Sequence, residues 1–287
     1  MEFFVQVLRI SGPYALAALA GTFSEVGGVV NIALEGILLN GALASVVATY
    51  YTGSPWLGVL AGIGAGVATA ALHALAALRY QVDQVVSGLA VNFLAAGSCR
   101  FVLKLVFHST SNSSRIESIS SWFGLDPFIV MALLIVPLCH WALKSTAFGL
   151  RLRAVGEHPR AAESLGVRVL AMRLKGVLLS GALAGLGGAW LALEQHQFTD
   201  GMSGGRGYIA LAAVIFGRWT PLGAAGAALF FGLAEALQIM LQTHDVRIPT
   251  QFIQMVPYAM TLIVVAGVLG RSRPPAADGV PYSGEQD

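Results

Sequence analysis

Apolar stretches long enough to cross a lipid bilayer recur along this chain, and they constrain its fold more than any other feature. A helix needs about 20 apolar residues to cross a hydrocarbon layer roughly 30 Å thick. Because the bilayer interior offers no water to backbone groups, such segments are expected to be helical. The sequence predicts an all-α, polytopic integral membrane bundle of about 8–10 spans. The apolar runs lie at 3–22, 29–51, 57–78, 84–107, 125–143, 176–193, 207–217, 222–241 and 252–270.

The composition excludes a water-soluble domain. Only 11% of the 287 residues are charged and 56% are hydrophobic, whereas soluble domains carry about a quarter charged residues. The net charge of +2 is too small to indicate a nucleic-acid partner. The first 20 residues lack the basic opening and cleavage site of a signal peptide. We therefore expect a retained first span in the inner (plasma) membrane.

Basic residues are concentrated in one segment, 144–175, which contains seven of the 17 Lys and Arg residues. Short loops rich in Lys and Arg stay in the cytoplasm, so this segment and the C-terminus after Arg271 are expected on that side. The polar loops 108–122 and 194–206 then lie outside. The span count leaves the side of the N-terminus open.

Glycine-interrupted segments predict broken helices. The run at 207–217 is too short to span and lies between "TDGMSGGRG" and "GRWTPLG", which indicates a half-helix. "VGGVVNIALEG" and "SGGRGYIALAAVIFG" both pair a Gly-Gly break with a short apolar segment. Such a pair is typical of the inverted repeats of transporters, with the pathway near the breaks; chance similarity is the alternative.

Glycines also recur every four residues inside two of the spans. Gly58, Gly62 and Gly66 share one helix face, and so do Gly181 and Gly185. Small residues at this spacing let helices approach closely. The spacing predicts a compact multi-helix bundle.

A short amphipathic helix is predicted inside the basic segment. In "GLRLRAVGEHPRAAESLGVRV" (149–169), Pro159 suits the first turn of a helix and Gly166 its end. Such a helix, displayed on the cytoplasmic face, can dock into a groove of another protein. The alternative is a basic loop that fixes topology and contacts anionic membrane lipid.

The 149–169 segment resembles the coupling segment of ABC-importer permeases in the branched-chain amino acid and simple-sugar superfamily. "NIALEG" (31–36), "DQVVSGLAVNFLAAG" (83–97) and "GRGYIALAAVIFGRWTPLGA" (205–224) resemble its nucleoside and simple-sugar branch. The resemblance covers about residues 10–270. It implies a permease domain at 1–270, with the coupling loop at 144–175. Composition predicts that residues 271–287 form a disordered tail.

The resemblance also implies partners and a substrate class. They are an ABC ATPase subunit, a second permease subunit (identical or related) and an external or lipoprotein substrate-binding protein that delivers a nucleoside or simple sugar. The chain has no G-x-x-x-x-G-K-[ST] motif, so it does not bind ATP in that manner. It is expected to be a transport subunit and not an enzyme, with energy supplied by a partner or a gradient.

Two sets of functional residues are expected. Carboxylates and amides inside the membrane need a partner or a water-filled cavity. Glu35 and Glu235 are the two carboxylates of this kind. The alternative for both glutamates is bonding to helix ends between packed spans. The expected ATPase-coupling residues are Arg151, Arg153, Gly156, Glu157, Pro159, Ala162 and Gly166. The expected substrate-path residues are Asn31, Glu35, Asn92, Phe198 and Gly205.

Two other function classes remain open at this stage. A gradient-driven secondary transporter of a small polar solute would also be helical and Gly-rich. A membrane enzyme or scaffold lacks support, because nothing resembles a nucleophile set and no Cys or His pair has metal-ligand spacing. No cofactor is expected. Cys99 and Cys139 lie in apolar runs and are expected to be free, buried thiols.

Overall fold

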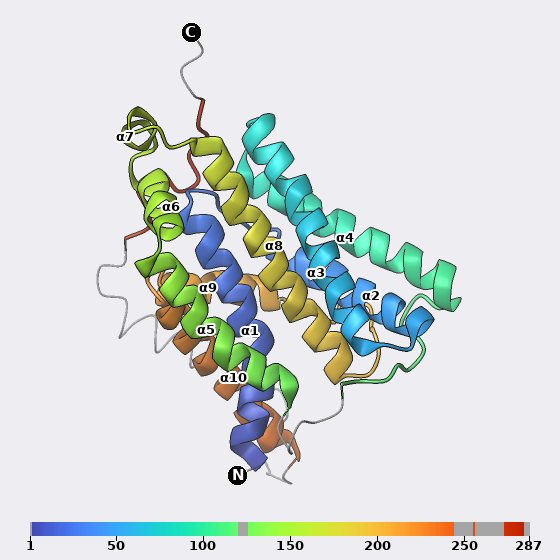
Figure 1. The fold of residues 1–287 in the computed structure, drawn as a ribbon. Helices are drawn as coiled ribbons and strands as arrows, with labels where there is room; N and C mark the ends of the chain where they lie inside the picture. Colours follow the sequence, from blue (N-terminus) through green and yellow to red (C-terminus); the bar gives the residue numbers. More distant parts are fainter. Residues whose placement is uncertain (1, 120–125, 244–254, 256–272, 284–287) are drawn as a thin grey trace.

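The computed structural model describes residues 2–119, 126–243, 255 and 273–283. This part of the chain is a bundle of helices (Figure 1), which confirms the predicted all-α membrane fold. Seven of its helices are long and apolar enough to cross a membrane. The predicted span at 252–270 lies, except for Met255, outside the described residues.

The helices follow the predicted apolar runs closely. The short helices are α6 (Ala147–Glu157), α7 (Pro159–Ser164) and α9 (Arg206–Phe216). The long helices are α1 (Glu2–Val26), α2 (Leu34–Thr52), α3 (Pro55–Ala74, continued by the π-helical turn η1, Leu75–Arg79), α4 (Gln84–Phe107), α5 (Pro127–Ser145), α8 (Val169–Glu194) and α10 (Pro221–Thr243).

The polar connections lie at two opposite ends of the bundle. Helices α6 and α7 and the segment 273–283 share one end, shown at the top of Figure 1. Helix α8 leads from that end to the other, where the loop 195–200 pairs with residues 111–116 through backbone hydrogen bonds. The basic segment and the two polar loops are therefore separated by the bundle, as the charge pattern predicts.

Glycines bring α2, α3 and α8 into close contact at the centre. A Cβ atom on Gly66 would lie 2.3 Å from the carbonyl oxygen of Gly181 and 2.6 Å from Cα of Gly185. A Cβ atom on Gly41 of α2 would lie 2.7 Å from the carbonyl oxygen of Gly185. The glycine spacing predicted from the sequence is thus used for backbone-to-backbone packing.

Local sequence signals account for several helix ends. The Asp83 side chain accepts hydrogen bonds from the Val85 and Val86 N–H groups at the start of α4, as expected of an N-cap. Gly166, with φ of 81°, follows α7 in the left-handed conformation that favours glycine. The predicted half-helix at 207–217 is α9, and Gly204 and Gly205 before it have φ of 56° and 84°.

The described part of the C-terminal tail departs from the expected disorder. Residues 273–283 pack against α6, α7 and α8, and Pro275, Ala277 and Tyr282 are buried. The polar, Pro-rich composition predicts no core of its own. The segment is held by contacts to distant residues, which composition does not reveal.

Candidate functional site

The N-terminus of the half-helix α9 meets the first turn of α2 inside the bundle. Glu35 accepts hydrogen bonds from the N–H groups of Gly205, at 2.8 Å, and Gly207, at 2.7 Å. Helix N-termini carry unpaired N–H groups and a partial positive charge. One carboxylate in the first turn of α2 thus stabilises the starts of both helices. Gly207 permits this approach, because a Cβ atom there would lie 2.3 Å from the backbone nitrogen of Glu35.

Asn92 of α4 joins the same two broken segments. Its amide nitrogen donates to the carbonyl oxygen of Ile32, at 2.9 Å, and to the hydroxyl of Tyr208, at 3.0 Å. Its amide oxygen accepts from the Gly36 N–H group at 2.8 Å. All the hydrogen-bonding groups of this amide but one lone pair are therefore used, and they hold the break before α2 to the first turn of α9.

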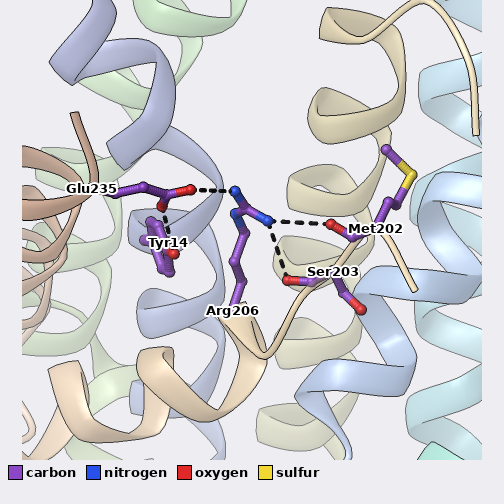
Figure 2. Close-up of polar contacts among 5 residues, drawn as sticks. All are labelled: Tyr14, Met202, Ser203, Arg206 and Glu235. Carbon is purple, nitrogen blue, oxygen red and sulfur yellow. Dashed lines mark hydrogen bonds and ion pairs between the residues drawn. The ribbon is translucent and has the colours of Figure 1, made fainter. Parts of the chain in front are cut away.

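A partly buried ion pair fixes the other side of the α9 N-terminus. Arg206 lies 2.7 Å from Oε1 of Glu235 in α10, and Tyr14 of α1 donates its hydroxyl to Oε2 of the same carboxylate at 2.7 Å (Figure 2). Arg206 also donates to the carbonyl oxygens of Met202 and Ser203. Its guanidinium carbon lies 5.5 Å from the centre of the Tyr14 ring. This arrangement supplies the partner that an intramembrane carboxylate requires.

Three of the five predicted path residues, Glu35, Asn92 and Gly205, come together at the start of α9. We call the cluster that they form with Arg206, Glu235 and Tyr14 the α9 hub. The other two lie elsewhere. Asn31 is fully buried and donates to the Ser180 hydroxyl of α8 at 3.0 Å. Phe198 is fully buried in the loop after α8, and its N–H group bonds to Ser113. A role in the path remains a prediction for all five.

Sequence reasoning did not select Tyr14, Arg206 or Tyr208. Arg206 carried a signal, because it is a charge between glycines at the start of an apolar run. The two tyrosines carried none, since a tyrosine in an apolar run is common and its partners are distant in sequence.

The predicted coupling segment forms a two-helix surface at the basic end. We call α6 and α7, with the residues that follow to Gly166, the coupling surface. Leu152 and Ala162 are buried beneath it, while most of its charged side chains point outward. The exposed residues of the predicted coupling set are Arg151, Arg153, Glu157 and Gly166, with Pro159 half-buried.

Gly156 and Ala162 are buried and hold the coupling surface in place. A Cβ atom on Gly156 would lie 2.1 Å from the carbonyl oxygen of Val26, at the end of α1. Only glycine allows this contact between α6 and α1. Gly156 and Ala162 are thus packed inside the surface, and a role in ATPase coupling remains a prediction for all seven residues.

The break between α1 and α2 connects this surface with the α9 hub. The Val30 N–H group donates to Gln84 at 2.7 Å, and a ring nitrogen of His73 lies 3.1 Å from the Val30 carbonyl oxygen. Glu25, near the end of α1, accepts a hydrogen bond from the indole of Trp219 at 2.6 Å, in the turn between α9 and α10. Residues 27–33 thus link α1, α3, α4 and the hub.

The described residues hold no group of three or more His, Cys, Asp or Glu side chains that could bind a metal ion. Cys99 and Cys139 are free and buried, which confirms their predicted state. The polar groups of the hub bind helix ends and one another, an arrangement suited to positioning half-helices.

Comparison with known families identifies the chain. Residues 3–265 match the family described as Branched-chain amino acid transport system / permease component. The chain belongs to this family. It is therefore a multi-pass membrane permease subunit, in agreement with the seven apolar helices.

Three curated relatives match over most of the chain. The chain is 39% identical to the guanosine ABC transporter permease protein NupQ of Bacillus subtilis, over 97% of this chain and 98% of NupQ. It is 39% identical to the nucleoside ABC transporter permease protein NupC of Lactococcus lactis, over 96% of this chain and 95% of NupC. A second guanosine permease protein of B. subtilis, NupP, is 26% identical over 91% of this chain and 80% of NupP.

A solved structure has the same fold. It is a metal-chelate type ABC transporter in an inward-facing conformation, with a TM-score of 0.58 and 18% identity, covering 92% of this chain and 87% of that chain. At this identity the likeness concerns the fold alone. The chain has the ABC-permease helical fold.

Proposed function

We propose that this chain is a permease subunit of an ATP-driven importer that carries nucleosides across the inner membrane. The near full-length identity of 39% to two nucleoside permease proteins is the observation that supports it most. A separate ATPase subunit hydrolyses ATP, and an external binding protein delivers the substrate. The simple-sugar assignment implied by the sequence motifs is the second candidate.

The coupling surface is proposed to dock the ATPase subunit. Its exposed side chains include Arg151, Arg153 and Arg160, while Gly156 packs directly on the end of α1. A push on α6 and α7 therefore reaches α1 and the break that follows it. The abundance of Lys and Arg at this end supports a cytoplasmic location for it and for the C-terminus, where anionic lipid headgroups add a favourable interaction.

The α9 hub is proposed to control the path. The starts of α2 and α9 meet inside the bundle and are held together by Glu35 and Asn92, while Arg206 joins the start of α9 to Glu235 of α10. Discontinuous helices of this kind form the substrate pathway of many transporters. A change in the orientation of α9 relative to α2 must break or strain these charge-assisted hydrogen bonds, so the hub suits a two-state gate.

The second permease subunit is proposed to be a related chain and not a second copy. B. subtilis has two proteins described as guanosine permease proteins, and this chain is 39% identical to one and 26% identical to the other. One organism thus has two different proteins with this description, and this chain resembles one more than the other, which supports a pair of distinct subunits. This chain corresponds to the NupQ-like one.

The test is uptake by proteoliposomes that contain this chain with the proposed ATPase subunit, second permease and binding protein. We expect labelled guanosine or uridine to accumulate only with internal ATP, and unlabelled glucose not to compete. Uptake that stops when the proton gradient is collapsed with ATP present would instead support a gradient-driven transporter. Uptake of labelled glucose, with no uptake of labelled nucleosides, would support the sugar assignment.

Docking is tested separately by charge reversal. Arg151→Glu should weaken association of the ATPase subunit, measured by co-purification, and lower uptake. Arg115→Glu is the matched control, because Arg115 is also exposed but lies in the polar loop at the opposite end. Equal co-purification of both variants with the ATPase would contradict the docking role of this surface.

A further inference from the structure

The tail segment 273–283 is attached to both helices of the coupling surface. The Ala277 N–H group donates to the carbonyl oxygen of Gly156 at 2.8 Å, at the end of α6. The hydroxyl of Tyr282 donates to Oε2 of Glu163 in α7. The tail therefore contacts α6 and α7 at separate points, on either side of the bend between them.

The same segment supplies partners to a buried cation. Arg173 of α8 has an exposed fraction of only 1%. Its guanidinium donates to the carbonyl oxygens of Val280, at 2.8 Å, and Ala277, at 3.4 Å, and lies 5.8 Å from the centre of the Tyr282 ring. A buried charge without partners is strongly unfavourable. The position of Arg173 in the core of this end thus depends on the tail.

The tail also abuts the break after α1. A Cβ atom on Gly28, whose φ is 84°, would lie 3.0 Å from the Ala277 carbonyl oxygen, and one on Gly279 would lie 3.4 Å from Val30. Between these contacts, burial raises the pKa of the Asp278 carboxyl to about 7, although Arg173 acts in the opposite direction. The tail is thus withdrawn from water where it meets the break.

These contacts connect three elements that the chain keeps far apart in sequence. The coupling surface, α8 and the break at 27–33 each touch the tail, and the break leads directly to Glu35 in the α9 hub. Gly156 already contacts Val26, so α6 has its own path to α1. The chain bends between Glu157, the last residue of α6, and Pro159, the first residue of α7. The hydrogen bond between Glu163 and the tail therefore gives α7 its own connection to the break after α1.

We propose that residues 273–283 form a brace that makes α7, α8 and the break after α1 move as one body. The brace passes the displacement of the coupling surface to the α9 hub. This inference rests on the proposed function, in which an ATPase subunit moves the coupling surface. Loss of the brace leaves a permease that assembles and lets ATP be hydrolysed but moves less substrate for each ATP.

The test compares tail variants in the complete complex. Tyr282→Ala removes both the contact with Glu163 and the ring beside Arg173, whereas Tyr282→Phe keeps the ring and loses the hydroxyl. Val280→Ala is the matched control, because the Val280 side chain is 52% exposed and its backbone acceptor is retained. A chain ending at residue 272 removes the whole brace.

The readout is nucleoside transported per ATP hydrolysed in proteoliposomes. Allosteric couplings commonly change an equilibrium by a factor of 5–150, so we expect Tyr282→Ala to lower this ratio about fivefold or more. Tyr282→Phe should give an intermediate value and Val280→Ala the wild-type value. A wild-type ratio for Tyr282→Ala would overturn the brace, while nucleoside uptake by the unaltered complex would leave the proposed function standing.

Hydrogen exchange gives a second readout that needs no transport and no truncated chain. Amides of residues 27–33 should exchange faster in Tyr282→Ala than in Val280→Ala, because the break loses its support. Unchanged exchange in 27–33 would overturn the inference even if the substrate proved not to be a nucleoside. Co-purification with the ATPase subunit shows that each variant has folded and assembled.

Discussion

At the scale of single residues, the charges inside the bundle are placed by their partners. Glu35 holds two helix starts, Glu235 holds Arg206 and Tyr14, and Arg173 is held by tail carbonyls. Glu35 and Glu235 lie in apolar runs, whereas Arg173 lies in the basic segment 144–175. Their partners satisfy the requirement that a charge in a low-dielectric interior be paired and hydrogen-bonded.

We expect Glu235→Gln to destabilise the fold by breaking the pair with Arg206. Removal of one partner from a fully buried pair costs about 3–5 kcal/mol. Because the Arg206 and Glu235 side chains are 18% and 24% exposed, a loss of about 2 kcal/mol in the free energy of unfolding is expected. Thermal and denaturant unfolding in detergent measures it.

Arg100→Gln is the control for this substitution. Arg100 pairs with Asp200 at 2.8 Å, but its side chain is 63% exposed, and exposed pairs contribute about 0–1 kcal/mol. Equal losses from the two substitutions would show that Arg206 and Glu235 do not form a stabilising pair.

The sequence identified the intramembrane carboxylates but not what they bind. An acid in an apolar run is rare enough to be noticed. Its partners are distant, since Glu35 and Gly205 are separated by 170 positions, and one sequence holds no information on that pairing. Phe198, selected as a substrate-path residue, is buried where two loops meet.

At the scale of elements, the glycines of α3 set how closely it packs on α8. We expect Gly66→Ala to destabilise the bundle, because its Cβ atom would meet the backbone of Gly181 and Gly185, which has no flexible side chain to move aside. Overpacking of this kind costs about 1–3 kcal/mol. The melting temperature of the purified chain in detergent measures the effect.

Gly64 offers a control on the same helix. A Cβ atom at Gly64 has no heavy atom within 4 Å, and alanine is the better helix former. Gly64→Ala should leave the melting temperature unchanged or raise it slightly. A lower melting temperature for Gly64→Ala than for Gly66→Ala would contradict the packing described for α3 and α8.

Long elements were easier to predict than short ones. The spans were predicted because length and hydropathy are local properties, and α9 because its run was too short and had glycines before it. Helix α6 was not predicted, since Gly149 and Gly156 lower its helix propensity. It is stabilised by Thr146, which caps it, and by the burial of Leu152 and Val155.

At the scale of the whole molecule, the distribution of charge predicted which connections share an end of the bundle. The basic coupling surface and the C-terminal segment do lie together. Their contact was not predicted, because Arg173 was counted with the other basic residues that set topology. It is in fact buried, and only the tertiary structure shows that a tail of low hydropathy completes its environment.

Assembly gives the last prediction, which tests the proposal that this chain and a second, different permease subunit form the path together. We expect this chain expressed with the ATPase subunit alone to give no nucleoside uptake, and addition of the proposed second permease to restore uptake. Native mass spectrometry of the active complex should show one copy of each permease, since the chain is 39% identical to NupQ but only 26% identical to NupP. An active complex that holds two copies of this chain and no second permease would show that it forms the path with itself.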